Sequence, residues 1–333
     1  MTAPTQSNPS IARAAVVGSG YMGGGIAQVM AMAGVRVDLL DQSVDVAEKS
    51  RLRILDEVTL QEDAGYWPAG TRSKLESLIS AAPSFEEAVH SADYITEAVS
   101  EDPAIKLDIL RRVSEAARPD TIIASNTSAL PIGLLAESVV HPERFLGVHW
   151  MNPAPLIPGV EIISTPQTDP LVAQKVIDFL LSCGKTPTRV SDSPGFVANR
   201  LQFALYKECM TMLETGVASA SEIDAVVSST FGFRLALFGP FTIGDMAGLD
   251  VCDAIYTTLE AAYGERFTSP LALRKLVDAH ELGLKSGGAG VYDLTAQDIA
   301  ALVKYREAAY FALSKAKGEL GAPPTLTPRN LDR

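Results

Sequence analysis

The sequence predicts an α/β protein in which a Rossmann-like, doubly wound sheet domain precedes an all-α C-terminal domain. From residue 13 to about 190, short apolar runs rich in β-branched residues alternate with segments of helical periodicity, as in a parallel sheet with crossover helices. After Ser193-Pro194-Gly195 the pattern is almost wholly helical. We therefore expect a sheet domain over residues 1–190 and a helical domain over residues 191–333.

A glycine-rich turn near the start of the chain predicts a dinucleotide site. An apolar run from Ala14 breaks at Gly18 and Gly20 and then continues at helical spacing to Ala33, which is the pattern of a strand, a tight turn and a helix. In such a turn the first glycine permits the bend, the second lets the backbone approach a pyrophosphate, and the third, here Gly23, lets the helix pack on the strand. Tyr21 and Met22 would open the helix, whose N-terminus favours an anion. Glycines also collect in ordinary turns, so this segment needs a second signal.

That second signal is an acid at the end of the next strand candidate. The apolar run 35–41 ends in Asp41, which lies 18 positions after Gly23. A carboxylate there can accept both ribose hydroxyls of an adenosine and would repel a 2′-phosphate. No Arg or Lys stands between Asp41 and Ala47 to neutralise such a phosphate. We therefore expect NAD rather than NADP; Asp41 as a helix N-cap is the alternative, but it does not account for the spacing.

The remaining elements follow from periodicity and from Gly and Pro boundaries. A hairpin around the Pro-rich turn 152–158 is expected to join two of the strands. The expected strands cover 92–99, 121–125, 144–150, 160–164 and 186–190, and the expected helices cover 44–60, 71–79, 103–117, 169–183, 197–215, 221–230, 250–263 and 271–281. The stretch 318–333 is expected to be a tail.

Composition excludes several classes of function. The 333 residues carry a net charge of −12, which disfavours a nucleic-acid or anionic-membrane surface. No apolar run reaches membrane-spanning length, and the polar first ten residues resemble a loose tail rather than a signal peptide. Cys183, Cys209 and Cys252 lack the spacing of metal ligands and suit a reducing compartment. We expect a cytoplasmic protein that acts on a small molecule and holds no metal.

Four polar residues are candidates for catalysis or substrate binding. His149 ends one arm of the expected hairpin and Glu161 lies on the returning strand, so the carboxylate can orient the imidazole as a general base. Ser128 follows a strand and Asn199 begins a helix. Each has a plainer alternative, since most such histidines are structural and Ser and Asn commonly cap helices.

Six ordered motifs resemble the L-3-hydroxyacyl-CoA dehydrogenases over about Ile11 to Asp293. They are Gly18-x-Gly20-x-x-Gly23, Ser125-Asn126-Thr127-Ser128, His149-Trp150-Met151-Asn152-Pro153, Glu161, Ser193 to Arg200, and Lys285-Ser286-Gly287. The resemblance implies NAD-dependent oxidation of the 3-hydroxyl of a 3-hydroxyacyl compound in fatty acid metabolism. It implies that His149 is the base, Glu161 its partner, and that Ser128 and Asn199 hold substrate oxygens.

The same resemblance extends to the cofactor and to assembly. Glu101 and Lys106 match positions that lie near the nicotinamide ribose in the family. The helical domain of the family forms a homodimer and closes over the active site, which implies the same for the helical half of this chain.

Two departures leave the substrate open. Members that use CoA thioesters carry a lysine-rich helix that meets the CoA phosphates, whereas residues 61–70 are acidic and aromatic here, with Arg72 and Lys74 as the nearby basic residues. Residues 233–240 resemble the branch that acts on free hydroxy acids, such as carnitine and gulonate dehydrogenases, while 244–250 resemble the CoA branch. Arg234 can pair with a free carboxylate, or it can be a plain surface residue. A non-catalytic NAD-binding structural protein is a remote alternative, against which the retained His149 and Glu161 speak.

Overall fold

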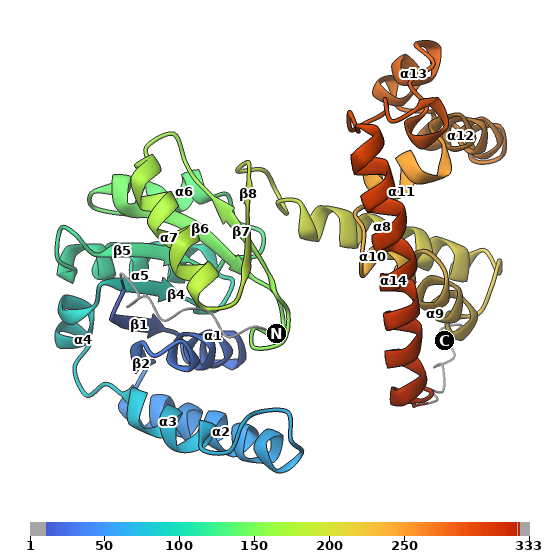
Figure 1. The fold of residues 1–333 in the computed structure, drawn as a ribbon. Helices are drawn as coiled ribbons and strands as arrows, with labels where there is room; N and C mark the ends of the chain where they lie inside the picture. Colours follow the sequence, from blue (N-terminus) through green and yellow to red (C-terminus); the bar gives the residue numbers. More distant parts are fainter. Residues whose placement is uncertain (1–10, 325, 327–333) are drawn as a thin grey trace. The chain divides into compact units, whose positions relative to one another are not determined.

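A computed structural model of the chain describes residues 11–324 and 326 (Figure 1). The chain divides into two compact units, Met1–Leu205 and Tyr206–Arg333, which we describe separately. The tail predicted for the first ten residues lies outside the described residues, as do 325 and 327–333 of the predicted C-terminal tail.

The first unit is built on one eight-stranded sheet of order β3-β2-β1-β4-β5-β6-β7-β8. Neighbouring strands are parallel except β6 and β7, which form the antiparallel hairpin that the Pro-rich turn predicts. The chain leaves β1 toward β2 and β3 and then returns to the other side of β1, so the order reverses between β1 and β4; ligands of such sheets bind at this point. The strands are β1 (Arg13–Val17), β2 (Arg36–Leu40), β3 (Ile79–Ala81), β4 (Tyr94–Glu97), β5 (Ile122–Ser125), β6 (Phe145–Trp150), β7 (Gly159–Ile163) and β8 (Thr186–Val190).

Helices cover both faces of this sheet, which confirms the predicted doubly wound architecture. Several begin at side chains that accept a hydrogen bond from the first turn: Ser43 caps α2, Asp102 caps α5 and Asp169 caps α7. The helices are α1 (Tyr21–Met32), α2 (Val44–Asp63), α3 (Thr71–Leu78), α4 (Phe85–Ser91), α5 (Pro103–Ala116), α6 (Ile132–Ala136) and α7 (Pro170–Ser182), with a 3₁₀ turn η1 (Pro142–Arg144).

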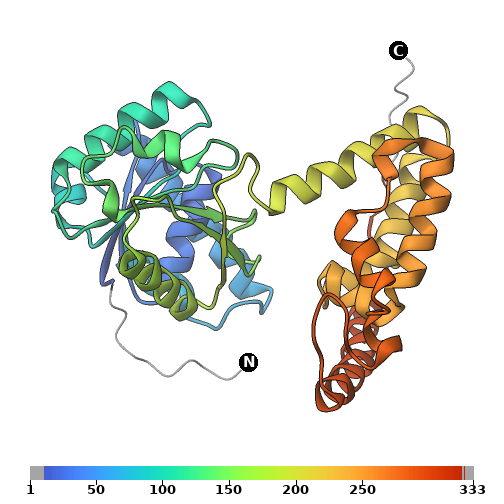
Figure 2. The same ribbon diagram turned by 90° about the horizontal axis from the view of Figure 1, so that it is seen from above.

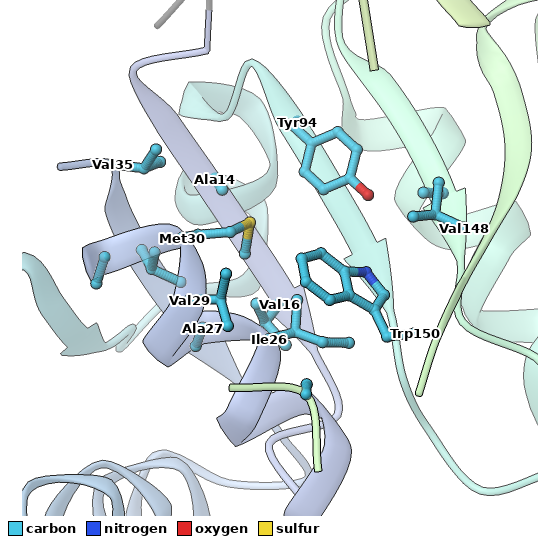
Figure 3. Close-up of a cluster of buried hydrophobic side chains, with 14 of the residues drawn as sticks. Ala14, Val16, Ile26, Ala27, Val29, Met30, Val35, Tyr94, Val148 and Trp150 are labelled. Carbon is cyan, nitrogen blue, oxygen red and sulfur yellow. The ribbon is translucent and has the colours of Figure 1, made fainter. Parts of the chain in front are cut away.

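A hydrophobic core between the sheet and the helices α1 and α7 packs α1 against β6, the strand that carries His149. Figure 3 shows Met30 and Ile26 of α1 facing Trp150 and Tyr94, which come from β6 and β4. All four side chains are at most 2% exposed. Their packing fixes α1 against the strand ends that form the site, because closely packed interiors leave little room for displacement.

The second unit is helical, as the sequence predicts (Figures 1 and 2). It contains α9 (Ala220–Ser229), α10 (Phe231–Leu235), α11 (Pro240–Ala247), α12 (Leu249–Tyr263), α13 (Leu271–Asp278) and α14 (Ala296–Leu320), with 3₁₀ turns η2 (Glu265–Phe267) and η3 (Gly283–Ser286); α8 (Ala198–Glu214) spans the division between the units.

The longest helix, α14, corrects the expectation of a tail from residue 318, because residues 318–320 form its last turn. Residues 282–317, which hold most of α14, have no predicted element. Thr295 and Asp298 start α14 with a capping box. Tyr310 then lies 5.8 Å from both Phe233 and Phe238, measured between ring centroids, which seats α14 beside α10.

Candidate functional site

The glycines of the β1–α1 turn have distinct structural roles. Gly18 has φ +97°, and a Cβ there would lie 2.6 Å from the carbonyl carbon of Ala98 on the neighbouring strand end. A Cβ on Gly23 would lie 1.9 Å from the carbonyl oxygen of Gly18. A Cβ on Gly20 would meet no atom within 4 Å. Packing therefore requires the first and third glycines, while the second leaves the backbone open to an approaching ligand.

This turn opens into a cavity of about 590 Å³ at the reversal point of the sheet. The carboxylate of Asp41 lies at its edge, where Oδ2 accepts hydrogen bonds of 2.7 Å from both the N–H and the hydroxyl of Ser19. The walls combine apolar side chains, including Leu40, Val44, Phe85, Ile105 and Ile109, with polar groups near Asp41. Apolar walls beside a fixed carboxylate suit an adenine and its ribose, so the residues present fit a dinucleotide.

The two residues between the glycines lie differently. Tyr21 is 59% exposed, and Met22 packs against the core. Arg53 of α2 stacks over the Tyr21 ring at 5.8 Å and donates a hydrogen bond of 3.2 Å to the carbonyl of Gly20. Sequence reasoning missed this arginine, because helical periodicity places it on α2 without showing that α2 meets the turn.

His149 and Glu161 form a buried pair. They are direct partners in the antiparallel β6–β7 register, and His149 Nδ1 lies 2.8 Å from Glu161 Oε2. Oε1 of Glu161 accepts hydrogen bonds from the N–H groups of Val197 and Ala198, at 3.0 and 2.9 Å. Phe196 has φ 48° and places its ring 5.6 Å from the imidazole. The carboxylate thus fixes the imidazole through Nδ1 and leaves Nε2 for chemistry.

The structure also brings Ser128 and Asn199 together. Asn199 Nδ2 donates a hydrogen bond of 2.8 Å to the carbonyl of Ser128. Two residues earlier, Asn126 Oδ1 accepts the N–H of Trp150 at 2.9 Å, which anchors this loop beside the end of β6. Within the described part of the chain, the Ser128 hydroxyl makes no hydrogen bond to protein. The four candidate residues, His149, Glu161, Ser128 and Asn199, all lie in the first unit.

Glu101 and Lys106 belong to an ionic cluster with Glu97, which is not among the predicted site residues; Glu97 and Lys106 are buried, and Glu101 lies at the exposed end. Lys106 is 1% exposed, and its ammonium lies 2.7 Å from Glu97 and 3.3 Å from Glu101. Burial alone would raise the pKa of Glu101, but the hydrogen bond from Thr127, the Lys106 charge and the N–H of Ser128 together hold that pKa below its ordinary value. Glu97 could not be found from the sequence, because a glutamate at the end of a strand does not by itself indicate a buried lysine partner.

Comparison with known proteins agrees with this geometry. The NAD binding domain of 3-hydroxyacyl-CoA dehydrogenase matches residues 13–193, and the C-terminal domain of the same enzymes matches residues 195–294. The chain belongs to the 3-hydroxyacyl-CoA dehydrogenase family. Its cofactor is NAD, and the class of reaction is NAD-dependent oxidation or reduction, as the motifs predict.

Relatives in this family act on more than one kind of substrate. A 3-hydroxybutyryl-CoA dehydrogenase of Clostridioides difficile is 36% identical over 281 residues, which are 84% of this chain and 98% of that protein. A 5-formyl-3-hydroxy-2-methylpyridine 4-carboxylate 5-dehydrogenase of Mesorhizobium japonicum is 33% identical over 290 residues, 86% of this chain and 92% of that one. The solved 3-hydroxyacyl-CoA dehydrogenase of Archaeoglobus fulgidus has a TM-score of 0.75 and 30% identity, and the match covers 92% of this chain and 99% of that one.

The regions that bear on substrate choice have few free cations. Arg72 pairs with Glu76 at 2.8 Å, and Lys74 donates to the carbonyl of Met32 at 2.7 Å. Trp67 of the acidic, aromatic segment donates its indole N–H to Gln61 at 2.6 Å. Arg234 lies exposed on α10 in the second unit, and the described residues offer its side chain no ion pair. No helix in residues 11–324 is long and apolar enough to cross a membrane.

Proposed function

We propose that the protein oxidises the 3-hydroxyl group of a 3-hydroxyacyl-CoA with His149 as the general base. The observation that carries this proposal is the buried 2.8 Å contact between His149 Nδ1 and Glu161. Because the carboxylate accepts the Nδ1 proton, Nε2 keeps its lone pair and can take the proton of the hydroxyl group. Bound NAD supplies the hydride acceptor for C3. Loss of the proton to Nε2 and of the hydride from C3 converts the alcohol to a ketone.

Ser128 and Asn199 are proposed to hold the substrate oxygens. The Ser128 hydroxyl is available as a donor, and the Asn199 amide retains one N–H and its oxygen after donating to the Ser128 carbonyl. Their mutual contact keeps both near the end of β6, where His149 lies. Gly18, Gly20, Tyr21, Met22, Gly23 and Asp41 are proposed to line the cofactor site, with Glu101 and Lys106 toward the nicotinamide ribose.

A free hydroxy carboxylate is the second candidate substrate. One argument for it is the Mesorhizobium relative, which is named for a pyridine carboxylate. The other is that Arg72 already pairs with Glu76 and Lys74 with the carbonyl of Met32, so neither cation is free to bind CoA phosphates. Arg234 is then the proposed partner of the free carboxylate, since a guanidinium binds a carboxylate bidentately. The thioester has the broader support of the family and of the Clostridioides relative.

The experiment that separates the candidates compares kcat/KM for L-3-hydroxybutyryl-CoA with kcat/KM for a panel of free hydroxy acids, in the native protein and in Arg234→Ala. A thioester preferred by orders of magnitude and unaffected by Arg234→Ala supports the first candidate. A free acid that is preferred, and that loses its preference in Arg234→Ala, supports the second.

We further propose that the protein acts in the cytoplasm, in fatty acid metabolism, and that its domain boundary lies near Ser191. It is also proposed to form a homodimer through the second unit. One observation supports the dimer: Val251 and Ile255 are 42% and 53% exposed on α12, where they line an open apolar groove. Sedimentation of the native protein beside Ile255→Asp tests it, since a charge in this groove should shift a dimer toward the monomer.

A further inference from the structure

Two deeply buried charged groups of the first unit take no direct part in the proposed proton and hydride transfer, although one of them, Lys106, belongs to the proposed cofactor site. Glu97, at the end of β4, is fully buried, and Lys106 of α5 is 1% exposed. The Lys106 ammonium lies between Glu97 at 2.7 Å and Glu101 at 3.3 Å. The carboxylates of Glu97 and Glu101 thus share the ammonium of Lys106. Because a buried charge that loses its partner is strongly destabilised, a change in one of the three groups should shift the positions of the other two.

Glu97 is the fixed inner end of this cluster. Its Oε2 accepts the hydroxyl of Ser125 at 2.5 Å, and its Oε1 accepts the N–H of Val99 at 2.8 Å in addition to the ammonium. These contacts come from β5, from the segment after β4 and from α5. Every oxygen of Glu97 is therefore held, and the carboxylate gives Lys106 a fixed anchor.

Glu101 is the outer end of the cluster, and it binds residues 127–129 of the loop that follows β5. Its Oε1 accepts the N–H groups of Ser128 and Ala129 at 2.9 and 3.1 Å and also the hydroxyl of Thr127. The carbonyl of Ser128 in turn accepts the amide of Asn199. A continuous series of polar contacts therefore runs from the sheet interior at Glu97 to both residues proposed to hold the substrate.

We infer that Glu97, acting through Lys106, is a positioning residue that places Glu101 and with it Ser128 and Asn199. The inference rests on the proposed function, in which the latter two bind substrate. If Glu97 loses its charge, the ammonium is attracted by Glu101 alone and Glu101 is drawn toward it, away from the N–H groups of residues 128 and 129. Small displacements of substrate-positioning groups are costly to catalysis.

The test begins with Glu97→Gln, which keeps the shape and removes the charge. We expect KM for the hydroxyacyl substrate to rise about tenfold, by analogy with other misplaced positioning groups. Affinity for ADP-ribose, measured by calorimetry, should change less than about twofold, because that ligand meets the Asp41 end of the cavity. Glu115→Gln is the matched control, since Glu115 lies on α5, the helix that carries Lys106, but is exposed and paired with Arg111.

A double variant separates charge balance from packing. Lys106→Met leaves two carboxylates facing each other and should lose most of kcat/KM, while Glu97→Gln with Lys106→Met removes one charge of each sign and should recover part of that loss. A role in packing alone would instead make the double variant at least as poor as the worse single variant, and that result overturns the inference.

Two further outcomes are decisive. If Glu97→Gln does not fold, Ser125→Ala takes its place, and an unchanged KM in that variant contradicts the inference. An unchanged KM in Glu97→Gln, with His149→Gln inactive, defeats the positioning role but leaves the proposed function intact. A native protein that oxidises no hydroxyacyl compound defeats the proposed function itself.

Discussion

Replacing Glu161 with glutamine should lower kcat by about 10- to 100-fold, which corresponds to about 1.4–2.8 kcal/mol of transition-state stabilisation. The reason lies in what Glu161 holds on its two sides. Oε2 faces His149 Nδ1 at 2.8 Å, and Oε1 accepts two backbone N–H groups at the start of α8. A carboxylate satisfies all three donors, whereas an amide has one oxygen and one NH₂ group.

Glutamine at this position has two orientations, and both are harmful. If its oxygen stays on the N–H groups of Val197 and Ala198, its NH₂ faces Nδ1, so the proton of the imidazole must move to Nε2, which then cannot accept the substrate proton. If its oxygen faces Nδ1, the NH₂ group opposes two backbone donors and leaves them unpaired, at about 1–3 kcal/mol each. The first orientation lowers kcat, and the second lowers the free energy of unfolding.

The assay is initial-rate formation of NADH, with NADH affinity and the free energy of unfolding measured on the same preparation. Glu143→Gln is the matched control, because Glu143 pairs with His141 at 3.3 Å and both side chains are exposed. It should leave all three quantities unchanged. A Glu161→Gln protein with native kcat and native stability would refute the argument.

Three further predictions follow from the cofactor side of the site. Gly18→Ala should destabilise the fold and abolish NAD binding, because a Cβ at this position would lie 2.6 Å from Ala98. Gly20→Ala should keep the native thermal stability and weaken only NAD binding. Equal melting temperatures for the two variants would contradict this prediction. The native protein should prefer NAD to NADP by at least tenfold in kcat/KM, about 1.4 kcal/mol, and Asp41→Ala should narrow that ratio; equal use of both cofactors would show that Asp41 has another role. Glu101 has a lowered pKa in the fold, so its stabilising contribution is present above the ordinary glutamate pKa and is lost as pH falls through the lowered value. The deficit of Glu101→Gln in free energy of unfolding, followed by denaturant titration, should therefore be largest near neutral pH and vanish in acid, and a deficit independent of pH would be inconsistent with it.

Local rules made the sheet domain predictable. The β1–α1 turn needs specific glycines at specific places, and the hairpin around the Pro-rich turn places His149 opposite Glu161 by strand pairing alone. Asp102 and Asp169 likewise start helices at the predicted places, because capping is a local interaction.

The rest depends on tertiary contacts that no local sequence pattern encodes. Strand β3 has three residues and lacks a periodic pattern of its own. Helix α14 has apolar residues spread around its circumference, so it lacks the stripe that marks an amphipathic helix, and aromatic contacts with Phe233 and Phe238 seat it instead. Glu97 and Lys106 meet only because β4 and α5 pack together, and no spacing rule links them.

The central claim is that His149 is the base of an NAD-dependent 3-hydroxyacyl dehydrogenase, and NADH formation by the native protein and by His149→Gln tests it most directly. With L-3-hydroxybutyryl-CoA and a panel of free hydroxy acids, the native protein should produce NADH with at least one substrate. His149→Gln should bind NADH as the native protein does while kcat falls by about 10² to 10⁴. A His149→Gln protein that keeps most of its activity, or a native protein that forms no NADH with any of these compounds, would contradict the claim.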